Sequence, residues 1–243
     1  MGRPHRAATG GLVYHVLNRA NARLPLFEGQ ADYEQFLAVL TEAHRRVAMR
    51  TIGYCIMPNH WHLLLWPRED GDLSEFMRWL TVTHTQRWHA AHGTAGTGHL
   101  YQGRFKSFPV QSRPPGRQAR AMGLIESGPP VLKVLRYIER NPLRADLVTR
   151  AQGWAWSSLP ARQAELSADR PPLTAPPDDL PTDWIDHVNR PQSRQELDTL
   201  RRSIQRGAPF GVEAWVLRTA RALGIESTLR PRGRPPVKGV RNL

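Results

Sequence analysis

Residues 57–67 have the sequence Met-Pro-Asn-His-Trp-His-Leu-Leu-Leu-Trp-Pro. The Pro-Asn pair favours a turn, and the bulky apolar residues that follow it favour a buried β-strand over 61–66. Successive side chains of a strand point to opposite faces of its sheet, so His60 and His62 are expected on one face and Trp61 on the other. The two imidazoles would lie about 7 Å apart along the strand. Such a pair can ligate one divalent ion if the chain supplies at least one further ligand.

A later stretch is the candidate source of that ligand. Residues 134–142 read Val-Leu-Arg-Tyr-Ile-Glu-Arg-Asn-Pro. In a helix, Tyr137 and Asn141 stand four residues apart, so a phenol and an amide oxygen point the same way. Pro142 disfavours helical geometry for the residue before it, and we therefore expect Asn141 at the end of the helix.

Five blocks of sequence carry a resemblance when they are taken together and in order. They are YHVLNRANARLPLF (14–27), YCIMPNHWHLLLWP (54–67), GHLYQGRFKSFPV (98–110), RYIERNPLRADLV (136–148) and WAWSSL (154–159). Over roughly residues 10 to 160 the chain resembles the HUH endonuclease superfamily, which is named for its His-hydrophobic-His motif. Within that superfamily it is most similar to the single-tyrosine transposases and their REP-associated branch.

The resemblance implies a function and a set of site residues. It implies a metal-dependent DNA transposase or endonuclease that cleaves and rejoins single-stranded or hairpin DNA. Tyr137 would be the nucleophile and would form a 5′-phosphotyrosine with a free 3′-hydroxyl, while His60, His62 and Asn141 would hold the metal. Neutral imidazoles with an amide oxygen and no thiolate are compatible with Mg²⁺ or Mn²⁺ acting on phosphate. Family position also makes His15 a candidate neighbour of the metal site.

Composition bounds the partner and the compartment. Thirty-four Lys and Arg residues against 21 Asp and Glu residues give a net charge of +13, and the sequence pI is about 11.1. GC-rich coding can replace Lys by Arg, but it does not create an excess over acids, so we expect a polyanionic partner. The single Cys55 excludes a disulfide framework and is expected to be buried in a strand. No apolar run is long enough to span a membrane, and the start lacks a secretory signal, so we expect a cytoplasmic protein.

Periodicity gives the order of the elements. Alternation predicts strands over 11–18, 51–57, 61–66 and 104–110. Three- and four-residue spacing of apolar residues predicts helices over 30–48 and 73–92, the second with Asp72 as N-cap. This order predicts an α+β fold, a ferredoxin-like split βαβ core with an antiparallel sheet and packed helices. The resembled family has the same core, with the tyrosine helix lying across the two histidines.

The chain is expected to divide into three parts. Residues 1–160 would form the transposase domain, 161–192 a Pro-rich linker or draped segment, and 193–243 a basic extension with short helices over 193–206 and 213–223. Inside the first part, residues 111–130 read as a loop rich in Pro, Gly and Arg, which is either a basic DNA-contacting flap or a tolerated insertion.

Several basic and aromatic residues are candidates for DNA contacts. Arg232 and Arg234 lie in an Arg-Gly-Arg-Pro segment similar to an AT-hook core, which can enter a narrow minor groove; a plain basic tail is the alternative. Arg104 and Lys106 alternate with Phe105, as phosphate contacts on one face of a strand would, or as a solvated basic edge strand would. Trp154 and Trp156 could stack on unpaired bases, although core packing is expected for at least one of them.

Two questions stay open at the level of sequence. A domesticated descendant that binds DNA hairpins without cutting them is the main alternative function, and a ferredoxin-like RNA binder is a weaker one. Mobile relatives work as dimers and the REP-associated branch as monomers, so the sequence leaves open whether the chain is a monomer or a homodimer.

Overall fold

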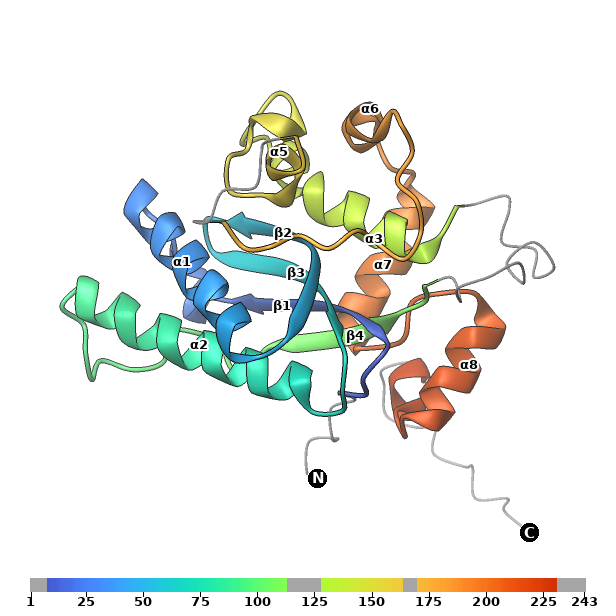
Figure 1. Ribbon diagram of the computed structural model, residues 1–243, viewed down its shortest axis with the longest axis horizontal. Helices are drawn as coiled ribbons and strands as arrows, with labels where there is room; N and C mark the ends of the chain where they lie inside the picture. Colours follow the sequence, from blue (N-terminus) through green and yellow to red (C-terminus); the bar gives the residue numbers. More distant parts are fainter. Residues whose placement is uncertain (1–7, 113–127, 164–169, 231–243) are drawn as a thin grey trace, which may run out of the picture.

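A computed structural model describes residues 8–112, 128–163 and 170–230 (Figure 1). The first part of the chain runs strand, helix, strand, strand, helix, strand: β1 Val13–Arg19, α1 Gln30–Arg46, β2 Met49–Met57, β3 His60–Pro67, α2 Asp72–Ala91 and β4 Lys106–Val110. The helices α3 Pro130–Glu139, α4 Asn141–Arg144, α5 Ser158–Ala161, α6 Trp184–Asn189, α7 Arg194–Arg206 and α8 Glu213–Ala222 follow. Short 3₁₀ turns lie at η1 Asn21–Arg23, η3 Ala151–Gly153 and η4 Glu226–Leu229.

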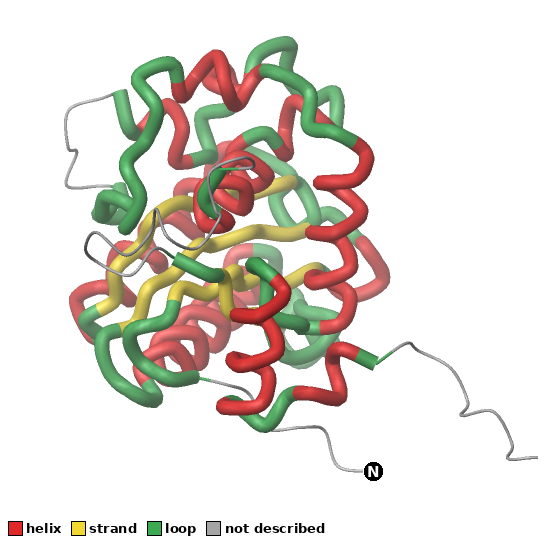
Figure 2. Tube along the Cα trace, turned by 90° about the vertical axis from the view of Figure 1, so that its right-hand side faces the viewer, coloured by secondary structure: helices red, strands yellow, loops and turns green. Residues whose placement is uncertain are grey.

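The four strands form one antiparallel sheet in the order β2-β3-β1-β4. The hairpin between β2 and β3 closes over Pro58 and Asn59, so that Met57 pairs with His60, as the Pro-Asn pair predicts. β3 and β1 are the two central strands, and Figure 2 shows the strands in the middle of the molecule with helices around them. The predicted α+β fold with an antiparallel sheet and packed helices is confirmed.

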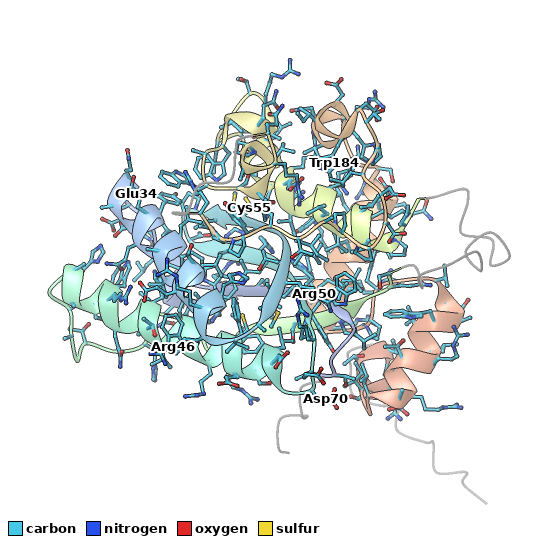
Figure 3. The ribbon with its side chains drawn as sticks, in the orientation of Figure 1. Glu34, Arg46, Arg50, Cys55, Asp70 and Trp184 are labelled. Atoms are coloured by element: carbon cyan, nitrogen blue, oxygen red, sulfur yellow. The ribbon has the colours of Figure 1, made fainter. Side chains whose placement is uncertain are left out.

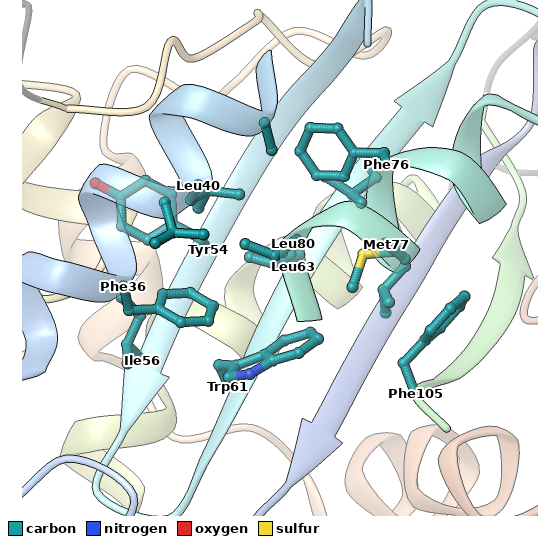
Figure 4. Close-up of a cluster of buried hydrophobic side chains, with 14 of the residues drawn as sticks. Phe36, Leu40, Tyr54, Ile56, Trp61, Leu63, Phe76, Met77, Leu80 and Phe105 are labelled. Carbon is teal, nitrogen blue, oxygen red and sulfur yellow. The ribbon is translucent and has the colours of Figure 1, made fainter. Parts of the chain in front are cut away.

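Helices α1 and α2 cover one face of the sheet. Their buried side chains meet those of the strands in a large apolar cluster, which Figure 4 shows with Phe36 and Leu40 of α1, Phe76 and Leu80 of α2, and Trp61 of β3. The α1 stripe follows the helical period, and burial of such a stripe stabilises a helix more than its intrinsic propensity does. Trp61 is fully buried here, which leaves the residues on either side of it for the opposite face.

Helix α3 covers that opposite face. Its apolar residues pack on β2, β3 and β4 in a second cluster, together with Cys55 on β2, which is buried as predicted (Figure 3). Gly53 lies against this helix, because a Cβ atom at this position would clash with Cδ1 of Leu135 on α3. The lack of a side chain at Gly53 therefore leaves room for Leu135.

Residues 170–230, which we call the C-terminal segment, pack against α3 and both edges of the sheet. Beside β2, Thr174 N donates to Thr51 O at 2.7 Å, and beside β4, Phe210 N donates to Pro109 O at 2.9 Å. The predicted linker therefore includes a segment that lies along the sheet edge and contains α6. The helices predicted over 193–206 and 213–223 are present as α7 and α8. The division of the chain into three parts stays a prediction.

A buried carboxylate joins this segment to α3. Glu139 is fully buried, and its Oε2 accepts a hydrogen bond of 2.7 Å from Nε1 of Trp184 on α6. Its Oε1 accepts from Ser158 Oγ at 2.6 Å and from Arg162 Nε at 2.8 Å. Arg136 of α3 and Arg140, which follows it, donate to backbone carbonyls of residues 188–191, so the C-terminal end of α3 is tied to the end of α6 and the residues after it.

Three local predictions need correction. Gly71, with φ of 93°, is the N-cap of α2, while Asp72 is its first residue and accepts hydrogen bonds from the backbone N–H groups of residues 68 and 69. The fourth strand begins at Lys106 instead of Arg104. Asn141 does not end the tyrosine helix: α3 ends at Glu139, and Asn141 begins the short helix α4.

Two predicted features lie wholly or mostly outside the described residues. Residues 113–127, most of the loop predicted over 111–130, lie outside the described residues, and so does the AT-hook-like segment. No helix in the described ranges combines the length and apolar character needed to cross a membrane.

Candidate active site

The two histidines of β3 lie on the face of the sheet that α3 covers. Their ring centroids are 5.0 Å apart with the planes at 84°, and His62 is only 3% exposed whereas His60 is half-buried. Burial, together with the nearby charges of Arg19 and Arg144, lowers the pKa of His60 to about 4. Burial also holds the pKa of His62 well below its usual range. Both imidazoles are therefore neutral at physiological pH, which is the form that binds metal ions.

Each of these rings has a polar neighbour at Nδ1. His60 Nδ1 lies 2.7 Å from Asn59 Oδ1, and an amide oxygen only accepts, so this nitrogen is the donor. His62 Nδ1 lies 2.9 Å from Nε2 of His15, a fully buried residue of β1. In both rings the engaged nitrogen is Nδ1, which leaves Nε2 as the atom for another partner.

Tyr137 of α3 lies above the histidines. Its ring centroid is 6.0 Å from that of His62 with the planes at 90°, and 6.3 Å from that of His15 with the planes at 75°. The tyrosine is 8% exposed. Residues of α3 on either side of it are buried against the sheet and the C-terminal segment, and this packing fixes the rotation of the helix that presents the ring.

Asn141 and Arg144 complete the group. Arg144 Nη2 donates to Asn141 Oδ1 at 2.5 Å, and its Cζ atom lies 4.1 Å from the centroid of the Tyr137 ring, a cation–π contact. Asn141 Nδ2 and Arg144 Nη1 are buried without a hydrogen-bond partner among the described residues. Buried polar atoms without partners are rare in native proteins, so these two nitrogen atoms are candidates to donate to a polar ligand.

The donor set fits a divalent metal ion. Two neutral imidazoles expose Nε2, and the amide oxygen of Asn141, which has two lone pairs, can bind a metal while Arg144 occupies one of them. No group of three or more His, Cys, Asp or Glu side chains in the described parts of the chain could hold a metal ion. Asn141 is the third protein ligand that the sequence predicts for a metal site at this corner.

The other predicted contact residues are spread more widely. Lys106 is exposed on β4, where it pairs with Leu17 and so shares the face of His15, whereas Phe105 is buried in the opposite cluster. Arg104 is exposed just before β4. Arg232 and Arg234 lie in the part of the chain that is not described.

Trp154 and Trp156 are engaged in the protein itself, as expected for at least one of them. Trp154 Nε1 donates to Ile56 O at 2.9 Å, and Trp156 stacks on Tyr33 with ring centroids 4.8 Å apart. Trp156 packs with the α1 cluster, whereas Trp154 packs against both this cluster and the second one, which contains Tyr137.

Sequence reasoning missed Arg144, and it named His15 only as a candidate neighbour of the metal site, which its contact with His62 agrees with. Arg144 stands three residues after Asn141 and seven after Tyr137, so helical spacing could have placed it on the same side. His15 meets His62 only through the register of β1 against β3, where Val16 pairs with Leu63. No local pattern in the sequence specifies that register.

The chain therefore combines a four-stranded antiparallel sheet, a His-x-His pair on a central strand and a tyrosine-bearing helix over the same face of the sheet. Residues 8–118 match the family described as "Transposase IS200 like". The match includes both histidines and ends before Tyr137. Members of this family are enzymes, and they generally depend on a metal ion.

Two solved structures are similar to the chain. One is a REP-associated tyrosine transposase bound to a REP hairpin; it is 17% identical, the match covers 74% of this chain and 95% of that one, and the TM-score is 0.49. The other is a proposed transposase from Deinococcus radiodurans R1; it is 18% identical, the match covers 49% of this chain and 91% of that one, and the TM-score is 0.35. No curated protein sequence matches the chain.

Proposed function

We propose that this chain is a metal-dependent single-tyrosine transposase of the REP-associated type, which cleaves and rejoins single-stranded hairpin DNA. The observation that carries the proposal is the convergence of Tyr137, His60, His62 and Asn141 from α3, β3 and α4 on one buried corner of the sheet. Any one of these residue types is common in a protein core. Apolar side chains would fill this corner equally well, so packing alone does not account for the convergence of these four residues.

The proposed reaction is a transesterification at phosphorus. The phenol oxygen of Tyr137 loses its proton and bonds to the phosphorus of the scissile phosphodiester; the bond from phosphorus to the 3′ oxygen breaks, and that oxygen takes up a proton. The products are a 5′-phosphotyrosine and a free 3′-hydroxyl. The number of phosphoester bonds is unchanged, so the 3′-hydroxyl of another strand can reverse the step and rejoin DNA without ATP.

The residues around Tyr137 have separate tasks. His60, His62 and Asn141 would hold Mg²⁺ or Mn²⁺, which when bound polarises a non-bridging phosphate oxygen. Arg144 places a guanidinium beside the tyrosine ring, and its unpartnered Nη1 can donate to the phosphate. Arg19, Lys106 and Arg104 lie exposed on nearby strands and loops, where they can contact the DNA backbone.

The test is a covalent-adduct assay with end-labelled single-stranded hairpin DNA from the region that flanks the gene. In Mg²⁺ or Mn²⁺ but not in EDTA, a denaturing gel should show labelled DNA attached to protein. The adduct should be absent from Tyr137→Phe and His60→Ala. Tyr33→Phe is the matched control, because Tyr33 is an equally buried tyrosine on the opposite face and its variant should retain the adduct.

The same assay separates the alternative function. In a hairpin binder that does not cut, the Asn141 oxygen would serve only its hydrogen bond with Arg144. A metal-independent shift of the hairpin on a native gel, with no covalent adduct under any condition, would establish that binder and refute the proposed enzyme.

A further inference from the structure

His15 is a buried polar residue that the proposed reaction does not use. It lies on β1, is fully buried, and is enclosed by Phe108, which it contacts edge-on with ring centroids 5.0 Å apart, and by Tyr137. Its Nε2 atom is 2.9 Å from His62 Nδ1, and the two ring planes meet at an angle of 18°. This is hydrogen-bond geometry between two imidazoles.

One of the two histidines must donate in this contact. A neutral imidazole has one N–H and one lone pair, so the direction of the bond decides which nitrogen of His62 carries the proton. If His62 donates from Nδ1, its Nε2 keeps a lone pair and can bind a metal. If His15 donates from Nε2, His62 is protonated at Nε2 and cannot bind a metal through that atom.

The neighbouring histidine indicates which direction the site uses. His60 donates from Nδ1 to the side-chain oxygen of Asn59, which leaves its Nε2 with a lone pair. Histidines that bind metals almost always donate their other N–H to an acceptor, which fixes the tautomer and the ring orientation. The side-chain oxygen of Asn59 is such an acceptor for His60. For His62, Nε2 of His15 occupies the corresponding position beside Nδ1.

We propose that His15 is a positioning residue that accepts the Nδ1–H of His62 and thereby holds the Nε2 of His62 ready for a metal ion. The inference rests on the proposed metal site. A merely structural role for His15 makes a different prediction, because an apolar side chain of similar volume in this buried place would then leave the metal site unchanged.

Mn²⁺ binding to the full chain, measured by isothermal titration calorimetry, distinguishes these roles. His15→Leu should weaken Mn²⁺ binding by about 10- to 100-fold, the usual effect of losing such an outer partner. His15→Gln should largely restore binding, because its terminal amide oxygen can reach the place of Nε2. His84→Leu is the control: His84 is an equally buried histidine on the opposite face, hydrogen-bonded to the Tyr101 hydroxyl at 2.7 Å, and its variant should bind Mn²⁺ like the parent.

A second measurement needs no variant of His15. Long-range ¹H–¹⁵N spectra of the parent protein in EDTA should show His62 protonated at Nδ1, with the resonance assigned by its loss in His62→Gln. Protonation of His62 at Nε2, or Mn²⁺ binding by His15→Leu that equals the parent's, would overturn the role of His15. Absence of Mn²⁺ binding by the parent itself would instead overturn the proposed metal site.

Discussion

Replacement of Glu139 by Ala should be among the most destabilising single substitutions in this chain. The Glu139 side chain is 0% exposed, and that of Arg162, which donates to it, is 14% exposed. Removing one partner of a buried ion pair leaves the other charge without compensation and costs about 3–5 kcal/mol. For a chain of this size that loss corresponds to a fall in Tm of about 6–20 °C.

Urea unfolding followed by tryptophan fluorescence measures this loss directly. Glu42→Ala is the matched control, because Glu42 also accepts from an arginine, Arg87, at 2.7 Å, but the two side chains are 35% and 41% exposed. Solvent screens that pair, so its loss should cost less than about 1 kcal/mol. Equal effects of Glu139→Ala and Glu42→Ala would refute the view that a buried carboxylate fastens α3 to the C-terminal segment.

Three further predictions concern the site, the pH dependence and the packing of α3. Arg144→Lys keeps the charge but loses the planar fork, so the single-turnover rate of adduct formation should fall by about 100-fold; an unchanged rate would exclude a role for the guanidinium. Burial lowers the pKa of His84 from 6.5 to about 3. Below pH 6.5 the unfolded chain therefore binds a proton at His84 that the folded chain does not. His84 alone should thus contribute about 1.4 kcal/mol per pH unit to the fall in the free energy of unfolding, down to about pH 3, and the other buried histidines add to it. Urea titrations at several pH values should show a shallower dependence for His84→Gln and the parent's dependence for the exposed His99→Gln. Gly53→Ala should cost about 1–3 kcal/mol by pressing on Leu135, and it should cost less in a Leu135→Ala background, where an additive result would contradict the close approach.

Much of the fold could be predicted from the sequence because its signals are local. Strand alternation and helical spacing depend on near neighbours, and they place the four strands and the helices α1 and α2 to within a few residues. His60 and His62 share a face because they are two residues apart on one strand. Tyr137 and Asn141 were paired by the same kind of local spacing, although Pro142 starts a new helix instead of ending the old one.

The remainder depends on contacts between distant residues. His15 reaches His62 through strand register, and Glu139 meets Trp184 and Arg162 across 45 and 23 residues of chain. A glutamate in a basic helix reads as a surface residue, because its burial is specified only by the donors that surround it. The error at Asp72 has a similar origin: its carboxylate does bind backbone N–H groups at the start of the helix, but from the first helical position.

Mass spectrometry of the reacted protein tests the central claim most directly. The chain is incubated with Mn²⁺ and a hairpin oligonucleotide, digested with nuclease and trypsin, and searched for peptides that carry a nucleotide. The account predicts a nucleotide phosphate on the peptide that contains Tyr137, and none in EDTA. A nucleotide attached to another residue, or an unmodified Tyr137 in protein that has cut the DNA, would contradict the assignment of Tyr137 as the nucleophile.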